Sequence, residues 1–274
     1  MLTLITATLN AARLLDRAVA SAAGQGIAYQ HIVVDGGSSD ETGAICTRHG
    51  SIDFVLAPGS SIYEAWNIGI ERAQGAALLF LNADDELAPG AMAVVERTLR
   101  ERPEAEIIAG QALVGDDDAP LAPLVRHIAA SDDAFSVSQL VCGVPAINAL
   151  AFRPSLFRRY GKVETRYRIA GDRAFLLRLA LAAEPPRIAT VDAVLYRYHV
   201  NSGSLTLKRS LEQRLRVARD HLALSRQLLG EAPPVEAARW LRHLRRREGT
   251  VAALRCVAAG RPGEGLEFLR AFFG

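Results

Sequence analysis

One segment organises the chain around it: Leu78-Leu79-Phe80-Leu81-Asn82-Ala83-Asp84-Asp85-Glu86-Leu87-Ala88-Pro89. Its apolar run is too short to cross a membrane and is typical of a strand buried on both faces, followed by a helix that begins at the proline. Ligands bind at the carboxyl ends of parallel strands, so the adjacent acids predict a hard divalent cation, Mg²⁺ or Mn²⁺, particularly one already bound to phosphate. The alternative is a solvated turn whose acids complement the dipole of the next helix.

Three strand–helix pairs precede this segment. Residues 1–9, 31–35 and 52–57 have the composition of strands, and residues 11–23, 44–49 and 62–73 have helical spacing. Four β–α units in succession predict an α/β fold with a mostly parallel, doubly wound, Rossmann-like sheet and helices on both faces.

Polar residues follow the first two predicted strands. The first turn carries Thr6, Thr8 and Asn10, which can either contact the base or ribose of a nucleotide or cap the next helix. Asp35 ends the second strand and can accept a hydrogen bond from a nucleobase N–H or a ribose hydroxyl, while Gly36 permits close backbone approach. Neither turn has the glycine pattern of a dinucleotide site or a P-loop, so we expect neither type of phosphate site here.

Three later segments carry candidate chemistry. Asn148 lies in a strand-like segment at 144–153, Asp172 opens an apolar helix, and a strand at 187–198 runs into Tyr196-Arg197-Tyr198-His199. Asp172 is either an acid that complements the helix dipole or a general base whose pKa a carboxylate-rich pocket raises. A lone histidine in a loop is usually just solvent-exposed, and the acidic run at 116–118 predicts a solvated turn.

Charge divides the chain into two unlike halves. Its 274 residues are 50% hydrophobic with a net charge of +2, but residues 1–125 hold 7 basic and 17 acidic side chains, and residues 126–274 hold 25 and 13. An acidic first half suits a metal site, and the basic helical segment at 208–247 can either pack on the catalytic domain or lie on anionic membrane. Three scattered cysteines and the lack of a signal-like N-terminus or spanning run predict a cytoplasmic protein, peripheral to the membrane at most.

Four motifs in order resemble the family 2 glycosyltransferases. They are Thr8-Leu9-Asn10, the segment from Val34 to Thr42, the segment from Ile62 to Ile70, and Leu81-Asn82-Ala83-Asp84-Asp85. The resemblance covers about residues 1–205. It implies a GT-A fold and an inverting enzyme that uses a sugar nucleotide, a divalent metal cofactor (Mn²⁺ or Mg²⁺), and a glycan or lipid-linked acceptor in surface polysaccharide biosynthesis.

The resemblance also implies roles for single residues. Asp35 would hold the base or ribose, Asp84 and Asp85 would form a D-x-D-type element with one acid on ribose and one on the metal, and Asp172 would be the base. Asn148 would contact the acceptor or the diphosphate. Many relatives have Glu immediately before the base, where this chain has Gly171. The remaining implied contacts are the donor pocket (Tyr63, Asn67, Asn82, with Thr6, Thr8, Asn10 and Gly36), the diphosphate (Arg197) and the metal (His199).

We therefore expect a catalytic domain at residues 1–205, with a nucleotide-sugar half (1–115) and an acceptor and base half (116–205), and a basic helical extension at 206–274. A UDP-sugar ranks ahead of a GDP- or dTDP-sugar as donor. The alternatives are a non-catalytic protein that binds nucleotide sugar or the membrane surface, and a sugar nucleotidyltransferase, although the glycine-rich loop and lysine of the latter are missing. Nucleic acid is not an expected partner, because no aromatic and basic residues interleave as on a nucleic-acid platform.

Overall fold

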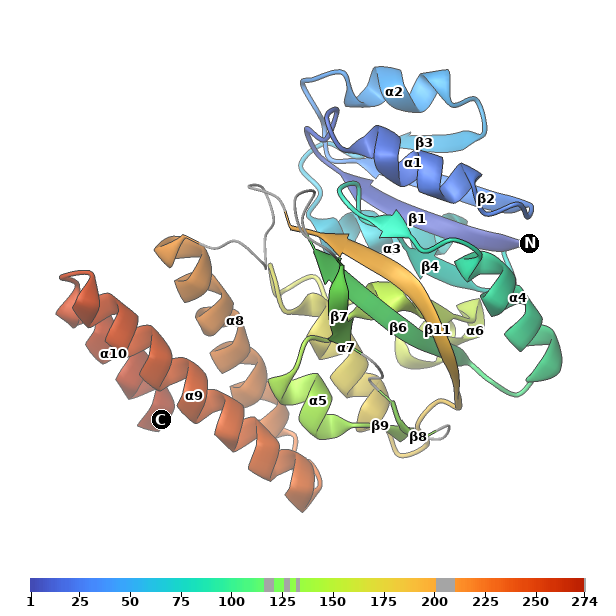
Figure 1. Ribbon diagram of the computed structural model, residues 1–274. Coiled ribbons are helices and arrows are strands. Elements are labelled where there is room, and N and C mark those ends of the chain that lie inside the picture. The colour runs from blue at the N-terminus through green and yellow to red at the C-terminus, as the bar shows by residue number, and fades with distance from the viewer. Residues whose placement is uncertain (116–120, 126–128, 132–133, 201–209, 274) are drawn as a thin grey trace.

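A single curved sheet forms the centre of the protein (Figure 1). The computed structural model describes residues 1–115, 121–125, 129–131, 134–200 and 210–273. The sheet order is β3-β2-β1-β4-β10-β6-β11-β5, and β7 is attached to β6. The predicted turn at 116–118 and the predicted domain boundary at 205 lie outside the described residues.

The first half of the sheet follows the predicted β–α units. Strands β1 (Leu2–Thr8), β2 (Tyr29–Asp35), β3 (Ile52–Leu56) and β4 (Leu78–Phe80) are parallel, with Thr8 opposite Asp35 in the register. The intervening helices are α1 (Leu15–Ala23), α2 (Thr42–Arg48) and α3 (Ile62–Arg72). Parallel pairing brings the carboxyl ends of all four strands to one edge, which confirms the predicted placement of the strand ends.

The second half departs from a simple parallel continuation. Strand β10 (Leu150–Phe152) runs antiparallel between β4 and β6 (Ile107–Gly115), and β11 (Ile188–His199) is parallel to β6. Asp85 is not followed at once by a helix, because β5 (Glu86–Leu87) first pairs with β11. Helix α4 (Ala91–Glu101) begins only after Gly90, whose φ of 74° turns the chain. The remaining elements are β7 (Ala122–Val125), β8 (Ala129–Ser131), β9 (Ala134–Phe135), α5 (Val137–Cys142), the 3-10 helix η1 (Ile147–Ala149), α6 (Pro154–Tyr160) and α7 (Gly171–Ala180).

Helices cover both faces of the sheet, as predicted. On one face, the aromatic rings of Trp66 and Phe80 stack at 4.2 Å, and those of Phe157 and Phe175 at 5.3 Å, which joins α3, α6 and α7 to the strands. On the other face, α1 and α4 pack through Ala18 and Met92 on the apolar residues of β1, β4 and β6. The central strands β1, β4 and β10 are thus buried on both sides, which explains their continuous apolar sequences, whereas the edge strand β3 is partly exposed.

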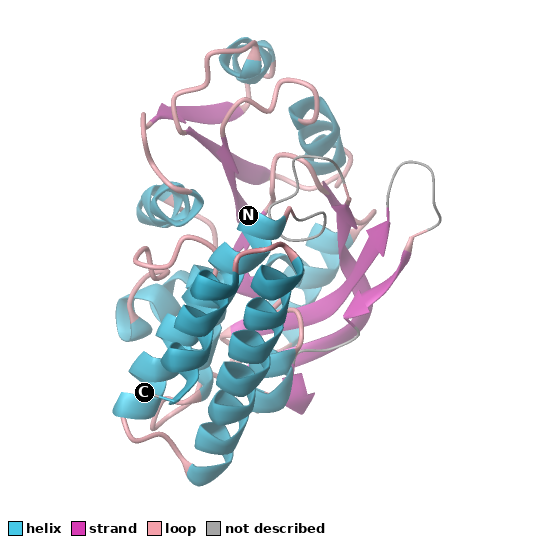
Figure 2. Cartoon of the chain, turned by 90° about the vertical axis from the view of Figure 1, so that its left-hand side faces the viewer, coloured by secondary structure: helices cyan, strands magenta, loops and turns pink. Residues whose placement is uncertain are grey.

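Three helices form the C-terminal extension: α8 (Leu211–Gly230), α9 (Val235–Ala258) and α10 (Pro262–Phe273). They project to one side of the sheet and lie beside one another (Figures 1 and 2). Leu224 and Leu228 of α8, with Leu241 and Leu244 of α9, join the same core as Phe175. One face of the extension therefore packs on the sheet domain. No helix in the described ranges is long and apolar enough to cross a membrane.

Candidate functional site

A polar turn follows β2 at the carboxyl edge of the sheet. Asp35 is only 2% exposed, and its carboxylate accepts hydrogen bonds from the Ser38 backbone N–H (2.9 Å) and from the Ser38 hydroxyl (2.5 Å). Asn10, at φ 51°, donates its backbone N–H to the same hydroxyl and accepts from the Ser39 N–H through Oδ1. These bonds lock the first two β–α turns together, and the direct contact of Asp35 with a nucleotide stays a prediction.

Two buried hydroxyls remain without a partner beside this turn. Thr8 Oγ1 and Ser60 Oγ have no hydrogen-bond partner among the described residues. Both residues flank Gly36: a Cβ there would stand 3.3 Å from the Ser60 carbonyl oxygen and 3.6 Å from that of Thr8. Buried hydroxyls are normally hydrogen-bonded, so these two residues mark the backbone at Gly36 as a place where polar groups still need partners. Ser60 carried no sequence signal of its own.

The turn after β4 is built around Asp85. Its carboxylate accepts from the Tyr196 hydroxyl (2.9 Å), the Asn82 side-chain amide (2.9 Å) and the His199 backbone N–H (2.8 Å). Burial, with the charge of Asp84, raises the pKa of Asp85 to about 7 against the effect of these donors. Asp85 is 3% exposed, so the prediction that it ligates a metal is not supported. Its carboxylate instead shapes the turn.

Asp84 is the more accessible of the two aspartates in this turn. It is partly exposed beside the buried Asp85, and Arg17 of α1 donates to its backbone carbonyl at 2.8 Å. Among the described residues, no group of three or more His, Cys, Asp or Glu side chains is arranged around one point. Mg²⁺ and Mn²⁺ commonly use one or two carboxylates together with substrate phosphates, so Asp84 fits such an ion when a diphosphate supplies further oxygens. The Nε2 atom of His199 lies 2.6 Å from Glu86 Oε2. Within the part of the chain that the structure describes, His199 does not form a metal-binding group with Asp84 and Asp85.

Asn148 and Tyr198 connect this turn to the rest of the site. Asn148 is 4% exposed; its amide donates to the Phe80 carbonyl (3.1 Å) and to Asn82 Oδ1 (3.3 Å), and its oxygen accepts from the Tyr198 hydroxyl (3.0 Å). The side-chain polar atoms of Asn148 thus all have partners inside the protein, so its predicted contact with acceptor or diphosphate is not supported and stays a prediction. Burial, with the charges of Asp85 and Asp172, raises the pKa of Tyr198. Tyr198 thus lies between the turn after β4 and Asp172.

Asp172 stands at the N-terminus of α7. Its Oδ1 accepts from the backbone N–H of Arg173 (2.7 Å) and lies 3.3 Å from the Tyr63 hydroxyl. Burial raises the pKa of Asp172, and the charge of Arg173 partly offsets the rise. A raised pKa brings a carboxylate closer to the range in which it takes up a proton during catalysis. The Arg173 side chain itself turns away and donates to three carbonyls at the end of α5.

Gly171 leaves no room for the glutamate that many relatives carry. A Cβ at this position would stand 2.3 Å from the Glu164 carbonyl oxygen and 2.6 Å from the ring of Tyr63. The Tyr63 hydroxyl donates to the Ile169 carbonyl at 2.6 Å. Tyr63 is 4% exposed and holds the loop before Asp172, so its predicted role in lining the donor pocket is not supported and stays a prediction.

Two further expected ligand contacts are not supported. Thr6 is completely buried, with its hydroxyl 3.0 Å from His31 Nε2 inside the sheet. The side-chain amide of Asn67 binds the backbone of Val163: it donates to the carbonyl (2.9 Å) and accepts from the N–H (3.0 Å). Arg197 is half-buried, and its Nε has no hydrogen-bond partner in the described part of the chain, so a diphosphate contact stays a prediction.

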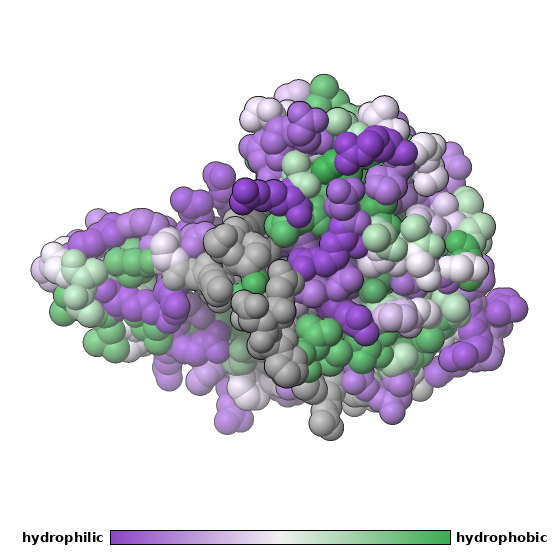
Figure 3. Space-filling model, turned by 45° about the horizontal axis from the view of Figure 1, so that its top comes forward, coloured by the Kyte–Doolittle hydropathy of each residue, from purple (hydrophilic) through white to green (hydrophobic). Residues whose placement is uncertain are grey.

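Four supporting residues were missed from the sequence: Arg17, Ser60, Tyr196 and Tyr198. The two tyrosines had a usable signal, because residues two apart on a strand share a face. Tyr196 and Tyr198 therefore lie on one face of the strand and donate to Asp85 and Asn148, whereas Arg197 and His199 lie on the other face. The role of Arg17 had no local signal, since its partner lies 67 residues away. On the side of the molecule that Figure 3 shows, hydrophilic residues cover much of the sheet domain, with hydrophobic residues scattered among them.

Comparison with known proteins identifies the family. The model described as glycosyl transferase family 2 matches residues 3–161. A PGL/p-HBAD biosynthesis glycosyltransferase of Mycobacterium bovis (strain BCG / Pasteur 1173P2) is 28% identical over 193 residues, covering 65% of this chain and 69% of that protein. An uncharacterized glycosyltransferase of Mycobacterium tuberculosis (strain ATCC 25618 / H37Rv) is 31% identical over 170 residues, covering 59% and 61%.

Two solved structures share the fold. S. aureus TarS in complex with UDP-GlcNAc aligns with a TM-score of 0.66 at 14% identity, over 94% of this chain and 72% of that one. The mannosyltransferase PcManGT from Pyrobaculum calidifontis, in complex with GDP-Man and Mn²⁺, aligns with a TM-score of 0.65 at 17% identity, over 98% and 74%. Since the family match spans more than half of the sequence and the fold agrees, the chain belongs to glycosyl transferase family 2 and is a glycosyltransferase with a GT-A fold.

Proposed function

We propose that this glycosyltransferase moves one sugar, with inversion, from a nucleoside diphosphate sugar to a hydroxyl of a glycan or lipid-linked acceptor. One observation carries the proposal: Thr8 and Ser60, whose buried hydroxyls have no hydrogen-bond partner among the described residues, flank Gly36 next to Asp35, and Thr8, Asp35 and Asp84 follow parallel strands whose carboxyl ends share one sheet edge. A polar ligand that fills this edge satisfies both hydroxyls and brings its phosphates towards Asp84. The similar structures that hold UDP-GlcNAc and GDP-Man support this reading.

The donor that we rank first is a UDP-sugar, ahead of a GDP- or dTDP-sugar. Asp84 would hold a Mn²⁺ or Mg²⁺ ion together with the diphosphate. A divalent ion there supplies positive charge that stabilises the departing diphosphate. The Mn²⁺ in the PcManGT complex supports the use of such an ion by this fold.

Asp172 would act as the general base. The acceptor oxygen attacks the anomeric carbon and forms the new C–O bond, while the bond from that carbon to the diphosphate oxygen breaks. The proton of the acceptor hydroxyl passes to Asp172, whose pKa is raised by burial. Tyr63 and Arg173 orient this carboxylate through the contacts at 3.3 Å and 2.7 Å.

The test combines binding and turnover. Calorimetric titration with UDP and with GDP, each with and without Mn²⁺, should show metal-dependent micromolar binding of one nucleotide. Asp84→Asn should remove the metal dependence, and Asp172→Asn should keep nucleotide binding but lose sugar transfer. Absence of binding by either nucleotide would refute the nucleotide site, and full turnover by Asp172→Asn would remove Asp172 from the role of base.

We further propose that the extension contacts anionic lipid, holding the protein at the inner face of the plasma membrane in surface polysaccharide biosynthesis. Arg239, Arg242 and Arg246 are exposed on α9, at intervals of three and four residues that place them on one helix face. The same helix exposes Leu254 (64%) and Val257 (57%) near its end. Basic residues with nearby apolar side chains suit an anionic membrane surface.

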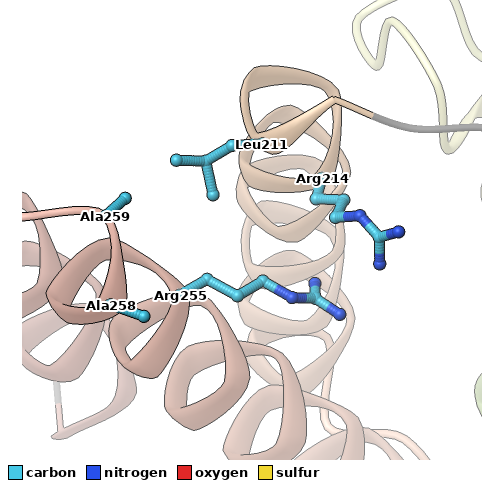
Figure 4. Close-up of a pocket in the computed structure, with 5 residues that line it drawn as sticks. All are labelled: Leu211, Arg214, Arg255, Ala258 and Ala259. Atoms are coloured by element: carbon cyan, nitrogen blue, oxygen red, sulfur yellow. The ribbon is translucent and has the colours of Figure 1, made fainter.

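A hollow at the same end of the extension adds to this surface. It is a shallow, open depression of about 350 Å³ between the start of α8 and the end of α9 (Figure 4). Its residues are Leu211, Arg214, Arg255, Ala258 and Ala259, and both arginines extend in the same direction. Co-sedimentation with phosphatidylglycerol vesicles should therefore exceed that with phosphatidylcholine vesicles and fall in an Arg239→Gln, Arg242→Gln, Arg246→Gln triple variant. Equal sedimentation with both lipids would refute the contact.

A further inference from the structure

The N-cap residue of helix α7, which carries Asp172, supplies no side-chain cap. Ala170 occupies the N-cap position with φ −100° and ψ 14°, and it has no side-chain oxygen to accept a hydrogen bond. The first backbone N–H groups of a helix need partners, and an uncapped end is costly when it is buried. Ala170 is 1% exposed, so water cannot replace a cap there.

A carboxylate from the C-terminal extension binds the two residues that lead into this helix. Asp220 of α8 accepts hydrogen bonds through Oδ2 from the backbone N–H of Ile169 (2.7 Å) and from that of Ala170 (3.3 Å). Asp220 thus binds the segment immediately before Asp172 from 48 residues further along the chain. The negative charge also complements the positive end of the α7 dipole.

The same peptide is held from its other side. The Ile169 carbonyl accepts from the Tyr63 hydroxyl at 2.6 Å, while the Ile169 N–H donates to Asp220. Tyr63 comes from α3 and Asp220 from α8, so two elements remote in sequence clamp one residue. Asp172 follows three residues later, and Tyr63 also lies 3.3 Å from its carboxylate.

Helix α8 has a second attachment to this loop. Gln227 accepts through Oε1 from the Tyr167 hydroxyl (2.5 Å) and from Arg166 Nη1 (3.0 Å). Gln227 lies seven residues after Asp220, which places both side chains on one face of the helix. Leu224, between them, and Leu228 are buried in the main core, so the face that holds the loop is itself anchored.

We propose that Asp220 is a positioning residue for Asp172. Through Asp220, helix α8 helps to hold the catalytic centre in place. Asp220 does not touch the reacting atoms; it fixes the Ile169–Ala170 backbone and thereby the direction in which the Asp172 carboxylate points. The family match ends at residue 161, so the match itself assigns no role to α8. The proposal rests on the proposed function of Asp172 as the base.

The test uses three variants of the full chain. Asp220→Ala removes the acceptor, Asp220→Asn keeps an oxygen that can accept the same two hydrogen bonds, and Glu212→Ala is the matched control. Glu212 is an acid on the same helix that pairs with Arg261 at the surface, away from the loop. The kinetic readout is hydrolysis of UDP-glucose, UDP-GlcNAc or GDP-mannose without added acceptor, in which water replaces the acceptor hydroxyl and no knowledge of the acceptor is needed.

The expected result is a loss of kcat with little change in KM. Asp220→Ala should lower kcat by roughly 10- to 100-fold, since a misplaced catalytic group costs rate rather than donor binding. The donor KM should stay within about twofold, Asp220→Asn should recover most of the rate, and Glu212→Ala should match the wild type. Hydrogen–deuterium exchange of the Ile169 and Ala170 amides should accelerate in Asp220→Ala alone.

The two readouts separate the possible failures. Unchanged amide exchange in Asp220→Ala would refute the clamp, and faster exchange with an unchanged kcat would refute the catalytic role of the clamp. A fall in kcat that Asp220→Asn does not recover would also overturn the proposal, because the hydrogen bonds would then not be its cause. If the wild type hydrolyses no donor and binds neither UDP nor GDP, the proposed function fails, and amide exchange still decides whether Asp220 holds the loop.

Discussion

The hydroxyl of Tyr196 offers a direct test of how the turn after β4 is held. Tyr196 is completely buried, and its hydroxyl donates to Asp85 Oδ2 (2.9 Å) and accepts from the Asn82 backbone N–H (2.9 Å). Tyr196→Phe removes both bonds but keeps the ring, whose centroid lies 4.6 Å from that of Tyr198. The variant therefore isolates the hydrogen bonds from the packing.

The magnitude follows from the two groups that lose a partner. A hydrogen bond to a charged group contributes about 1.5–3 kcal/mol, and a buried donor left without a partner costs about 1–3 kcal/mol. Asn82 is only half-buried, so water can partly replace the second bond. We expect the free energy of unfolding to fall by about 2–4 kcal/mol, which for a chain of this size lowers Tm by roughly 4–10 °C.

The assay is urea unfolding at pH 7.5, with Tyr160→Phe as the control. The Tyr160 hydroxyl also makes one hydrogen bond, to the Glu184 carbonyl (2.5 Å), but at the surface, so its loss should cost less than about 1 kcal/mol. Tyr196→Phe should also weaken Mn²⁺-dependent nucleotide binding by roughly 5- to 10-fold, because Asn82 and Asp85 flank Asp84. A loss of stability no larger than that of Tyr160→Phe would refute the view that this hydroxyl holds the turn.

Two further predictions concern burial. Burial lowers the pKa of His31 from 6.5 to about 4, so the unfolded chain binds more protons between these values, and stability is complete above pH 6.5 and declines as the pH falls towards 4. This pKa shift lowers the free energy of unfolding by roughly 3.4 kcal/mol at low pH and by about 2 kcal/mol at pH 5. His31→Gln should therefore lose less stability than the wild type between pH 7.5 and pH 5, as measured by urea unfolding. Parallel stability curves for the two proteins would contradict the role of His31. Gly171→Ala should destabilise the protein by about 1–3 kcal/mol or more and displace Tyr63, because its Cβ would stand 2.3 Å from a backbone oxygen. The control is Gly50→Ala, which should be nearly neutral because no atom lies within 4 Å of the added Cβ. Thermal unfolding compares the two variants, and equal Tm values would contradict the packing argument.

The buried face of α8 shows which structural features residue spacing can predict. The spacing of Leu211, Leu215, Ala218, Leu222 and Ser225 predicts one packed face; the last four are buried, and Leu211 at the start of the helix is only partly buried. The same reasoning predicted the four parallel strands and the edge at which Thr8, Asp35 and Asp84 lie, because side-chain periodicity and the direction of β–α units are local properties. Four short motifs in order then sufficed to predict the family.

Roles within the site depended on contacts between remote segments. Asp84 and Asp85 are adjacent and chemically identical, and only the arrival of Tyr196 and His199 from β11 buries one and leaves the other partly exposed. From the sequence, Asn148 and Asn67 were predicted to contact ligands. In the structure their side-chain amides donate to backbone carbonyls of remote segments.

The sequence by itself thus determined the β–α order, the ligand-binding edge and the family, because the repeating pattern of apolar residues decides which face each element buries. Only the tertiary structure decided that Asp85 and Tyr63 support the site, that Gly171 admits no side chain, and that Asp220 of α8 holds the backbone that leads into the helix of Asp172. The physical reason is that burial and hydrogen-bond partners are set by segments many residues apart, and no local spacing records which of them meet.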